Sequence, residues 1–360
     1  MKWSIRIGAL FGIPVYIHLT FLLLLVWIGV LSWREGESAR AGLEGVLFIS
    51  TIFACVVLHE LGHALTARRY GIVTRDITLL PIGGVARMER MPDDPRQELW
   101  VALAGPAVNV VIAAVLIAIT GVAAAIPDFS LTSGTFLNRL IAVNVFLVLF
   151  NLLPAFPMDG GRVLRALLAT RMEYTRATHL AATVGQMMAL LFGFVGLFVN
   201  PMLIFIAFFV WIGAAQEASM VQMKHSLAGI PVSRAMVTSF DTLAPNDTLE
   251  KAITATLAGT QKDFPVVEDG RVVGILLQGD LLAALARGGA HVPVKNVMQT
   301  DFEVMEASEM LDTAFRRLSA RKSSTAPVSN QGRLVGLVTM DNIGEFLAIA
   351  GALERTKRTA

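Results

Sequence analysis

The chain has 360 residues, of which 54% are hydrophobic and 16% charged, and its mean hydropathy is +0.62. This composition is too apolar for an ordinary soluble protein and is typical of a membrane protein with several spans. The net charge of +2 predicts no nucleic-acid partner, and the single cysteine, Cys55, excludes an intrachain disulfide and a cysteine metal cluster.

The N-terminal apolar run follows two basic residues but has no small-residue cleavage site, so we interpret it as a retained membrane segment. A membrane-spanning helix needs about 20 mostly apolar residues. The segments that meet this requirement are 15–33, 45–67, 98–121, 136–154, 179–199 and 201–219. The sequence therefore predicts a polytopic α-helical membrane domain with about six transmembrane helices.

Basic residues are concentrated in two of the connections between these segments, and short basic connections stay in the cytoplasm. The loop 121–138 has no lysine or arginine, and the loop after the first span has only Arg34 and Arg40. The basic connections follow the second span (Arg68, Arg69, Arg75, Arg87, Arg90, Arg96) and the fourth (Arg162, Arg165, Arg171, Arg176). This pattern predicts a multi-pass protein of the cell membrane with both termini in the cytoplasm.

The second predicted span contains the sequence HELGH, in which His59 and His63 are four residues apart. On a helix these histidines share one face and can bind the same ion, while Glu60 can reach a water on that metal without being a ligand. The alternative is a pair of packed histidines. However, each ionisable residue in a spanning helix costs about 2.5–3.5 kcal/mol on insertion scales, which favours a functional site.

The segment 71–88 lies between the second and third predicted spans. It is rich in β-branched residues, contains Gly83 and Gly84, and is too short and interrupted to cross the membrane. Extended backbone at membrane depth must be buried in protein or line a water-filled cavity. We predict a small membrane-associated β-element here, and the alternative is a cytoplasmic hairpin that only links two spans.

The fourth predicted span ends in NLLPAFPMDGGR. Pro154 and Pro157 break a regular helix before Asp159, and Gly160 and Gly161 permit close approach of the backbone. The predicted topology brings Asp159 to about the depth of the two histidines. Because a catalytic zinc usually has three protein ligands, Asp159 is the candidate third ligand. The alternative is that it caps the following helix.

After about residue 219 the charge density becomes that of a soluble α/β protein. An internal repeat aligns 232–240 with 294–302 and 265–276 with 327–338, both at an offset of 62 residues. The predicted domain organisation is a membrane domain (1–222), a linker (223–231), two repeats (232–289 and 290–350) and a C-terminal tail (351–360).

This repeat closely resembles a tandem pair of cystathionine-β-synthase-type (CBS) domains, which bind adenine nucleotides between the repeats or form dimers. The ribose-contacting motif of that family is Gly-h-h-Thr/Ser-x-x-Asp, where h is apolar, and it corresponds to GILLQGD and GLVTMDN. The resemblance implies an adenine nucleotide near Asp280, Thr339 and Asp341. The sequence departs from the motif where Leu277 replaces the hydroxyl and Asn342 the carboxylate.

HELGH and NLLPAFPMDGGR, with AGPAVN in the third predicted span, resemble the intramembrane zinc metalloproteases of the site-2 protease family. The similarity is greatest to the prokaryotic branch with C-terminal CBS domains. It implies one Zn²⁺ per chain, held by His59, His63 and Asp159, with Glu60 as the catalytic acid and base. It also implies that Asn151 faces the substrate or oxyanion, and that the β-element pairs with an unwound substrate.

We therefore predict an intramembrane zinc endopeptidase that hydrolyses a peptide bond in or near the transmembrane segment of a membrane-anchored protein. Glu60 activates a zinc-bound water in this hypothesis, and the site opens toward the cytoplasm. The expected partners are the substrate, the lipid bilayer and a second copy of the chain bound through the CBS pair. The alternative is a CBS-gated membrane transporter or channel, which gives HELGH and Asp159 no joint task.

Overall fold

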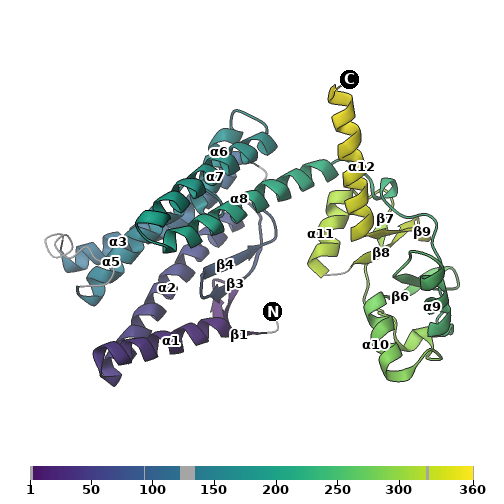
Figure 1. Cartoon of the computed structure of the whole chain (residues 1–360), viewed down its shortest axis with the longest axis horizontal. Helices are drawn as coiled ribbons and strands as arrows, with labels where there is room; N and C mark the ends of the chain where they lie inside the picture. Colours follow the sequence, from purple (N-terminus) through teal and green to yellow (C-terminus); the bar gives the residue numbers. More distant parts are fainter. Residues whose placement is uncertain (1–2, 93, 122–133, 322–323, 360) are drawn as a thin grey trace. The chain divides into compact units, whose positions relative to one another are not determined.

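The computed structural model describes residues 3–92, 94–121, 134–321 and 324–359. The chain divides into two compact units, Met1–Val221 and Gln222–Ala360. The first is mainly helical and the second mixes helices and strands (Figure 1). Most of the loop 121–138, which contributed to the predicted orientation, lies outside the described residues.

Long apolar helices dominate the first unit. They are α1 (Leu19–Gly36), α2 (Ala39–Arg69), α3 (Pro95–Thr120), α5 (Phe136–Asn151), α6 (Asp159–Ala169), α7 (Tyr174–Phe198) and α8 (Met202–Leu227). Among the described residues, five of these helices are long and apolar enough to cross a membrane: α1, α2, α3, α7 and α8. The fourth predicted span corresponds to α5, which is apolar but has only 16 residues. The unit therefore has the five to six spans of a multi-pass membrane domain.

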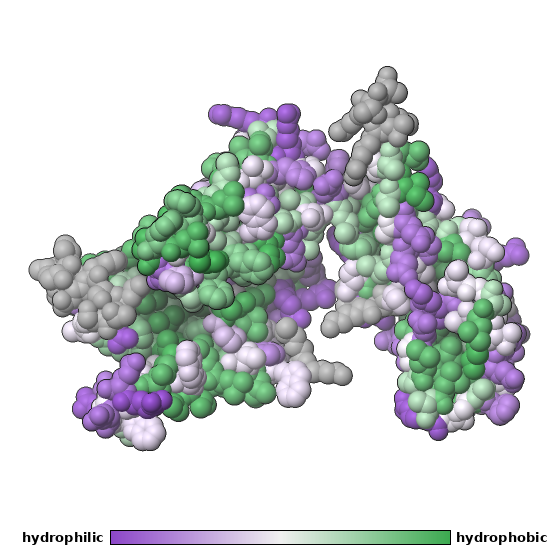
Figure 2. Space-filling model, in the orientation of Figure 1, coloured by the Kyte–Doolittle hydropathy of each residue, from purple (hydrophilic) through white to green (hydrophobic). Residues whose placement is uncertain are grey.

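The outer surface of these helices is apolar. Large side chains such as Leu190, Phe194, Phe205 and Phe208 are exposed on α7 and α8. Hydrophobic residues also cover much of the visible face of the helical unit (Figure 2). An apolar surface of this extent is unusual in a soluble monomer, and it fits a surface that contacts lipid.

A four-stranded sheet in the same unit has the order β1-β2-β3-β4. Its strands are β1 (Ser4–Leu10), β2 (Ile13–His18), β3 (Thr74–Leu80) and β4 (Gly83–Met88). The central pair, β2 and β3, is parallel, and the two outer pairs are antiparallel. The sheet confirms the predicted β-element in the segment 71–88 and adds two N-terminal strands to it.

The start of the first predicted span was wrong. Residues 15–18 belong to β2, and the helix begins only at Leu19. Phe11 and Gly12 both have positive φ, at 50° and 85°, which is the backbone of a tight turn between paired strands. The His18 side chain then accepts a hydrogen bond from the Thr20 amide and caps the new helix.

The sheet packs against α2, the helix that contains HELGH. Two clusters of buried apolar residues join the sheet to the helices: Val15, Phe21, Phe53, Val57 and Leu79 in one, and Ile13, Leu61, Ala64 and Ile77 in the other. The edge strand β4 therefore lies beside the helix turn that contains the histidines.

The second unit contains two copies of one supersecondary pattern. The first copy has η1 (Val232–Arg234), α9 (Leu249–Ala258), β5 (Phe264–Glu268), β6 (Arg271–Leu276) and α10 (Gln278–Gly288). The second has η2 (Val294–Asn296), β7 (Met305–Glu306), α11 (Leu311–Arg321), β8 (Thr325–Asn330), β9 (Arg333–Thr339) and α12 (Met340–Thr359). The predicted repeat is therefore present in the fold.

The two copies exchange their opening segments. Val237 exchanges backbone hydrogen bonds with Leu337 of the second copy, and Gln299 does the same with Ile275 of the first. The last turn of α8 also joins this unit, because Leu227 is buried in the apolar core of the second copy. The predicted linker 223–231 thus begins inside a helix that starts in the membrane unit.

Candidate metal centre

Three predicted ligands meet in the interior of the membrane unit. The Nε2 atoms of His59 and His63 are 3.1 Å apart, and each lies 3.2 Å from Oδ2 of Asp159. The exposed fractions of the three residues are 6%, 3% and 7%. The helix spacing of the histidines and the turns between α5 and α6 therefore bring donors about 100 residues apart in sequence to one point.

Hydrogen bonds fix which nitrogen of each histidine faces this point. His63 Nδ1 lies 2.7 Å from the Val101 carbonyl, which can only accept, so this nitrogen carries the proton. His59 Nδ1 lies 2.6 Å from Oδ1 of Asn109, whose Nδ2 in turn donates to Asn144 at 2.8 Å. Both Nε2 atoms are therefore unprotonated and face the point where the three donors converge, as metal ligands must.

The spacing of the donors fits zinc. Tetrahedral zinc has nitrogen and oxygen ligands at about 2.0–2.1 Å, which places neighbouring donor atoms about 3.3 Å apart. Two imidazole nitrogens and one carboxylate oxygen at 3.1–3.2 Å match this spacing and leave one position for a water or substrate. These three residues are therefore a suitable donor set for a catalytic zinc ion.

Asp159 is the first residue of α6, and its carboxylate faces the histidines. The residue before the helix is Met158, and no side-chain hydrogen bond caps this end. The capping alternative is therefore not what the structure shows. A Cβ atom on Gly160 would collide with the backbone of Leu152 and Leu153. The close approach expected of the glycine pair is confirmed, and it allows the chain to turn sharply before α6.

Gly105, in the AGPAVN segment of α3, lies against the metal centre. A Cβ atom at this position would be 2.7 Å from Nε2 of His59 and would also collide with the His63 ring. No side chain larger than hydrogen fits between α3 and the two imidazoles. The helix α3 therefore packs closely against the helix that contains both histidines.

Glu60 is half-buried and lies against the edge strand β4. Its Oε2 accepts a hydrogen bond of 3.2 Å from the backbone amide of Ala86. A Cβ atom on Gly84 would be 2.8 Å from the Cγ atom of Glu60, so the strand passes very close to this side chain. Glu60 is not one of the three converging donors, and it remains available for proton transfer.

Asn151 is half-buried, and its side-chain amide donates to the Leu147 carbonyl at 3.0 Å. Among the described contacts it has none with the three metal donors, so its predicted role near the substrate stays a prediction. The hydrogen bonds that Asn109 and Asn144 make were not predicted from the sequence. The feature of the sequence that could have indicated them is the presence of an asparagine within each of two apolar spans.

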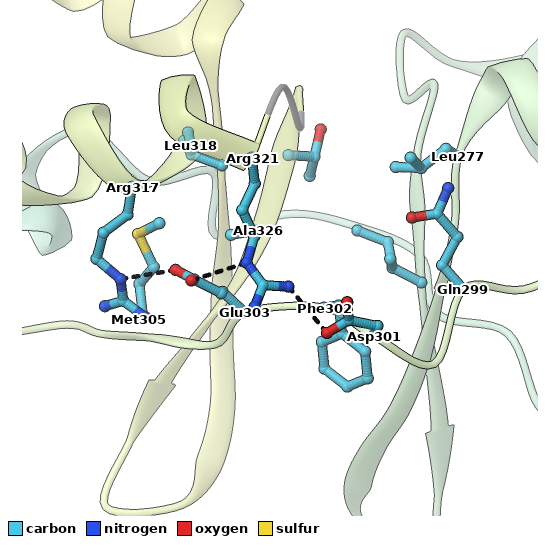
Figure 3. A pocket seen from close by; sticks show the side chains of 12 residues that line it. Leu277, Gln299, Asp301, Phe302, Glu303, Met305, Arg317, Leu318, Arg321 and Ala326 are labelled. Carbon is cyan, nitrogen blue, oxygen red and sulfur yellow. Dashed lines mark hydrogen bonds and ion pairs between the residues drawn. The ribbon is translucent and has the colours of Figure 1, made fainter. Parts of the chain in front are cut away.

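The CBS unit contains a cavity of about 350 Å³ between its two copies (Figure 3). Arg317 and Arg321 extend into it from α11, where they pair with acidic residues. Glu303 lies 2.7 Å from Arg317 and 3.0 Å from Arg321, and Asp301 lies 2.9 Å from Arg321. The hydrogen bond to Asp301 raises the pKa of Arg321. The arginines of this cavity are therefore already paired with carboxylates.

The predicted nucleotide contacts do not gather in this cavity. Asp280 accepts a hydrogen bond of 2.7 Å from Gln299, which does line it, and Leu277 lines it as well. Asp341 instead pairs with Lys262 at 2.9 Å, and the Thr339 hydroxyl accepts from the Asn342 amide at 3.0 Å. Nucleotide binding by these residues stays a prediction.

The fold and the buried donor set together define a membrane-embedded metallohydrolase. Residues 47–126 and 123–192 match Peptidase family M50, and residues 232–287 and 294–348 match the CBS domain. A zinc metalloprotease of Methanocaldococcus jannaschii is 34% identical, over 99% of this chain and 100% of that protein. The chain therefore belongs to the site-2 protease family, M50, and is a zinc metalloprotease with a C-terminal CBS pair.

Two further comparisons each cover part of the chain. Stage IV sporulation protein FB of Bacillus subtilis is 31% identical over 41% of this chain and 49% of its own length. The solved site-2 protease from Methanocaldococcus jannaschii is 40% identical, covers 60% of this chain and 95% of that chain, and has a TM-score of 0.44. Family membership decides between the two hypotheses of the sequence analysis in favour of the protease.

Proposed function

We propose that this protease cleaves a peptide bond in or near the transmembrane segment of a membrane-anchored protein, with Glu60 as the catalytic acid and base. The observation that carries the proposal is the position of Glu60. It follows a metal ligand in the sequence, stays outside the donor set, and contacts the edge strand β4 of the sheet through Ala86.

When bound, zinc acidifies a water and polarises the carbonyl that is attacked. Glu60 takes the proton from the attacking water and later passes a proton to the leaving amine. The bonds from His59 to Asn109 and from His63 to the Val101 carbonyl hold both imidazoles in the tautomer that the metal requires.

The edge strand β4 is the proposed substrate contact. A transmembrane helix hides its carbonyl groups in internal hydrogen bonds, so the substrate must unwind before it is cut. An unwound segment can add to a free sheet edge through its backbone. The Ala86 amide supports this arrangement, because it donates a hydrogen bond to Glu60. A strand paired with β4 would then lie beside the catalytic carboxylate.

The orientation in the membrane and the role of the CBS pair are proposed from the charge pattern and from the resemblance to the family. The basic connections support cytoplasmic termini, a cytoplasmic CBS pair and a site that receives water from the cytoplasm. The CBS pair would regulate the protease by binding an adenine nucleotide or by joining two copies of the chain. The arginines of the CBS cavity are paired with Asp301 and Glu303, so a phosphate group would have to compete with these carboxylates for the arginines.

The test of this function is Glu60→Gln in the full chain, reconstituted in vesicles with a single-span substrate. General acid–base catalysis contributes about 10²–10⁴-fold, so cleavage should fall by at least about 100-fold while zinc stays near one ion per chain. Glu44→Gln is the matched control, because Glu44 lies on the same helix with an exposed side chain. Cleavage near the wild-type rate in Glu60→Gln would refute the assignment.

A further inference from the structure

A buried arginine joins four helices near the metal centre. Arg165 lies on α6 and is 1% exposed, and its Nε is 2.9 Å from Oε1 of Glu98 on α3, which is fully buried. A second nitrogen of the same guanidinium pairs with Glu217 on α8. Its Cζ also lies 5.0 Å from the ring centres of Phe156 and Tyr174. We call Arg165, Glu98 and Glu217 the Arg165 cluster.

The cluster connects α6, which contains Asp159, to α3, which contains the Val101 carbonyl that orients His63. Asp159 begins α6, six residues and about 9 Å along the helix from Arg165. On α3, Glu98 precedes Val101, whose carbonyl orients His63, by one helical turn. An ion pair between Arg165 and Glu98 therefore fixes the helix that carries the third ligand against the helix that orients the second.

Stability alone is a poor reason for this arrangement. Burying a guanidinium and a carboxylate has a large desolvation cost, and well-packed apolar residues of similar size often serve stability as well or better. An arginine offers something that apolar packing lacks, because its planar fork binds two carboxylates in fixed directions. With partners on α3 and α8, that fork restricts both the position and the rotation of α6.

We infer that Arg165 is a positioning residue for the metal ligand Asp159, acting by locking α6 against α3 and α8. The inference rests on the proposed ligand role of Asp159 and goes beyond it, because none of the contacts described for Arg165 involves a metal donor. Glu98 is its fully buried partner, whereas the side chain of Glu217 is 30% exposed. Losing Glu98 should therefore disturb the metal site more than losing Glu217.

The test measures the affinity and the visible spectrum of Co²⁺ bound in place of zinc, using the full chain in detergent. The spectrum of bound Co²⁺ reports ligand geometry and requires no turnover. Arg165→Met should weaken Co²⁺ binding by about 10–100-fold, as other changes to the groups that orient metal ligands do, and should alter the spectrum. Arg165→Lys, which keeps the charge but loses the fork, should also alter it. Arg176→Met, at an exposed site on α7, is the control and should match the wild type.

Companion variants keep the result interpretable. If Arg165→Met does not fold, Glu98→Gln and Arg165→Lys replace it, with a stronger effect expected from Glu98→Gln than from Glu217→Gln. A folded Arg165→Met or Glu98→Gln protein with the wild-type cobalt spectrum and affinity would overturn the inference, provided that Asp159→Asn loses the metal. If Asp159→Asn also binds cobalt normally, the ligand assignment itself fails, and the positioning role fails with it.

Discussion

At the scale of single residues, the metal centre depends on groups that never touch the metal. The Val101 carbonyl and the Asn109 side chain hold the two imidazoles, and Asn144 holds Asn109. Such partners fix the ring orientation and raise the basicity of the ligands, and their loss commonly costs about 10–100-fold in metal affinity. The apolar spans therefore contain asparagines where hydrocarbon side chains would be expected.

Gly105→Ala should lower the affinity of this protein for zinc. The added methyl group would collide with both imidazoles, and the Gly105 backbone is fixed within α3. We expect at least about a tenfold loss of zinc affinity, comparable to the loss of a ligand-orienting group, measured by competition with a chelator. Gly193→Ala is the control, because a methyl group there would only reach ordinary contact, 3.7 Å from Ala207. Equal zinc affinity in the two variants would contradict the geometry described for α3.

The sequence could predict the ligands because their spacing and depth are local properties. Four-residue spacing predicted the shared face of His59 and His63, and the hydropathy pattern placed Asp159 at a similar depth. The Arg165–Glu98 pair was not predictable in this way, because 67 residues separate the partners. Arg165 was counted among the loop charges that set the orientation, whereas it is buried and paired.

At the scale of elements, the contact between α2 and β4 brings the Glu60 carboxylate, the proposed catalytic acid and base, to the sheet edge. Gly84 and Ala86 of β4 both lie close to Glu60. The sequence predicted the strand segment from its β-branched residues and glycines. It missed β1 and β2, because an apolar N-terminal run continues directly into the first span and hydropathy does not mark the turn at Phe11 and Gly12.

Gly84→Val should separate catalysis from metal binding. The new side chain would collide with Glu60 and with Val56, so the strand and the carboxylate cannot keep their contact. We expect cleavage to fall at least about tenfold, because misplacing a proton-transfer group lowers the rate steeply, while zinc content stays unchanged. Val85→Ala, at a neighbouring position with an exposed side chain, should have a much smaller effect. Full activity in Gly84→Val would show that the strand edge is not part of the active site.

At the scale of the whole molecule, the three metal donors all belong to the Met1–Val221 unit, and the CBS pair forms the other unit. The two units share α8, which carries Glu217 of the Arg165 cluster and ends in the core of the second CBS copy. The domain division was predictable from the change in charge density near residue 219. The continuation of a membrane helix into the CBS core was not, because the polarity of the sequence already changes before the helix ends.

Zinc removal should destabilise only one of the two units. A ligand that binds the folded state stabilises it by about 4 kcal/mol at 1,000 times its Kd, so a chelator should lower the melting temperature of the membrane unit. The CBS transition should stay in place, since none of the three donors lies in that unit. Scanning calorimetry of the full chain in detergent, with and without the chelator, measures both. A CBS transition that falls with zinc removal would contradict this separation.

X-ray absorption at the zinc edge of the purified protein tests the metal site directly. We predict about one zinc per chain, with two imidazole nitrogens and at least one oxygen at about 2.0–2.1 Å. His59→Ala/His63→Ala should lose the ion. A sulfur ligand at about 2.3 Å, or unchanged zinc content in the double variant, would contradict the His59, His63 and Asp159 site.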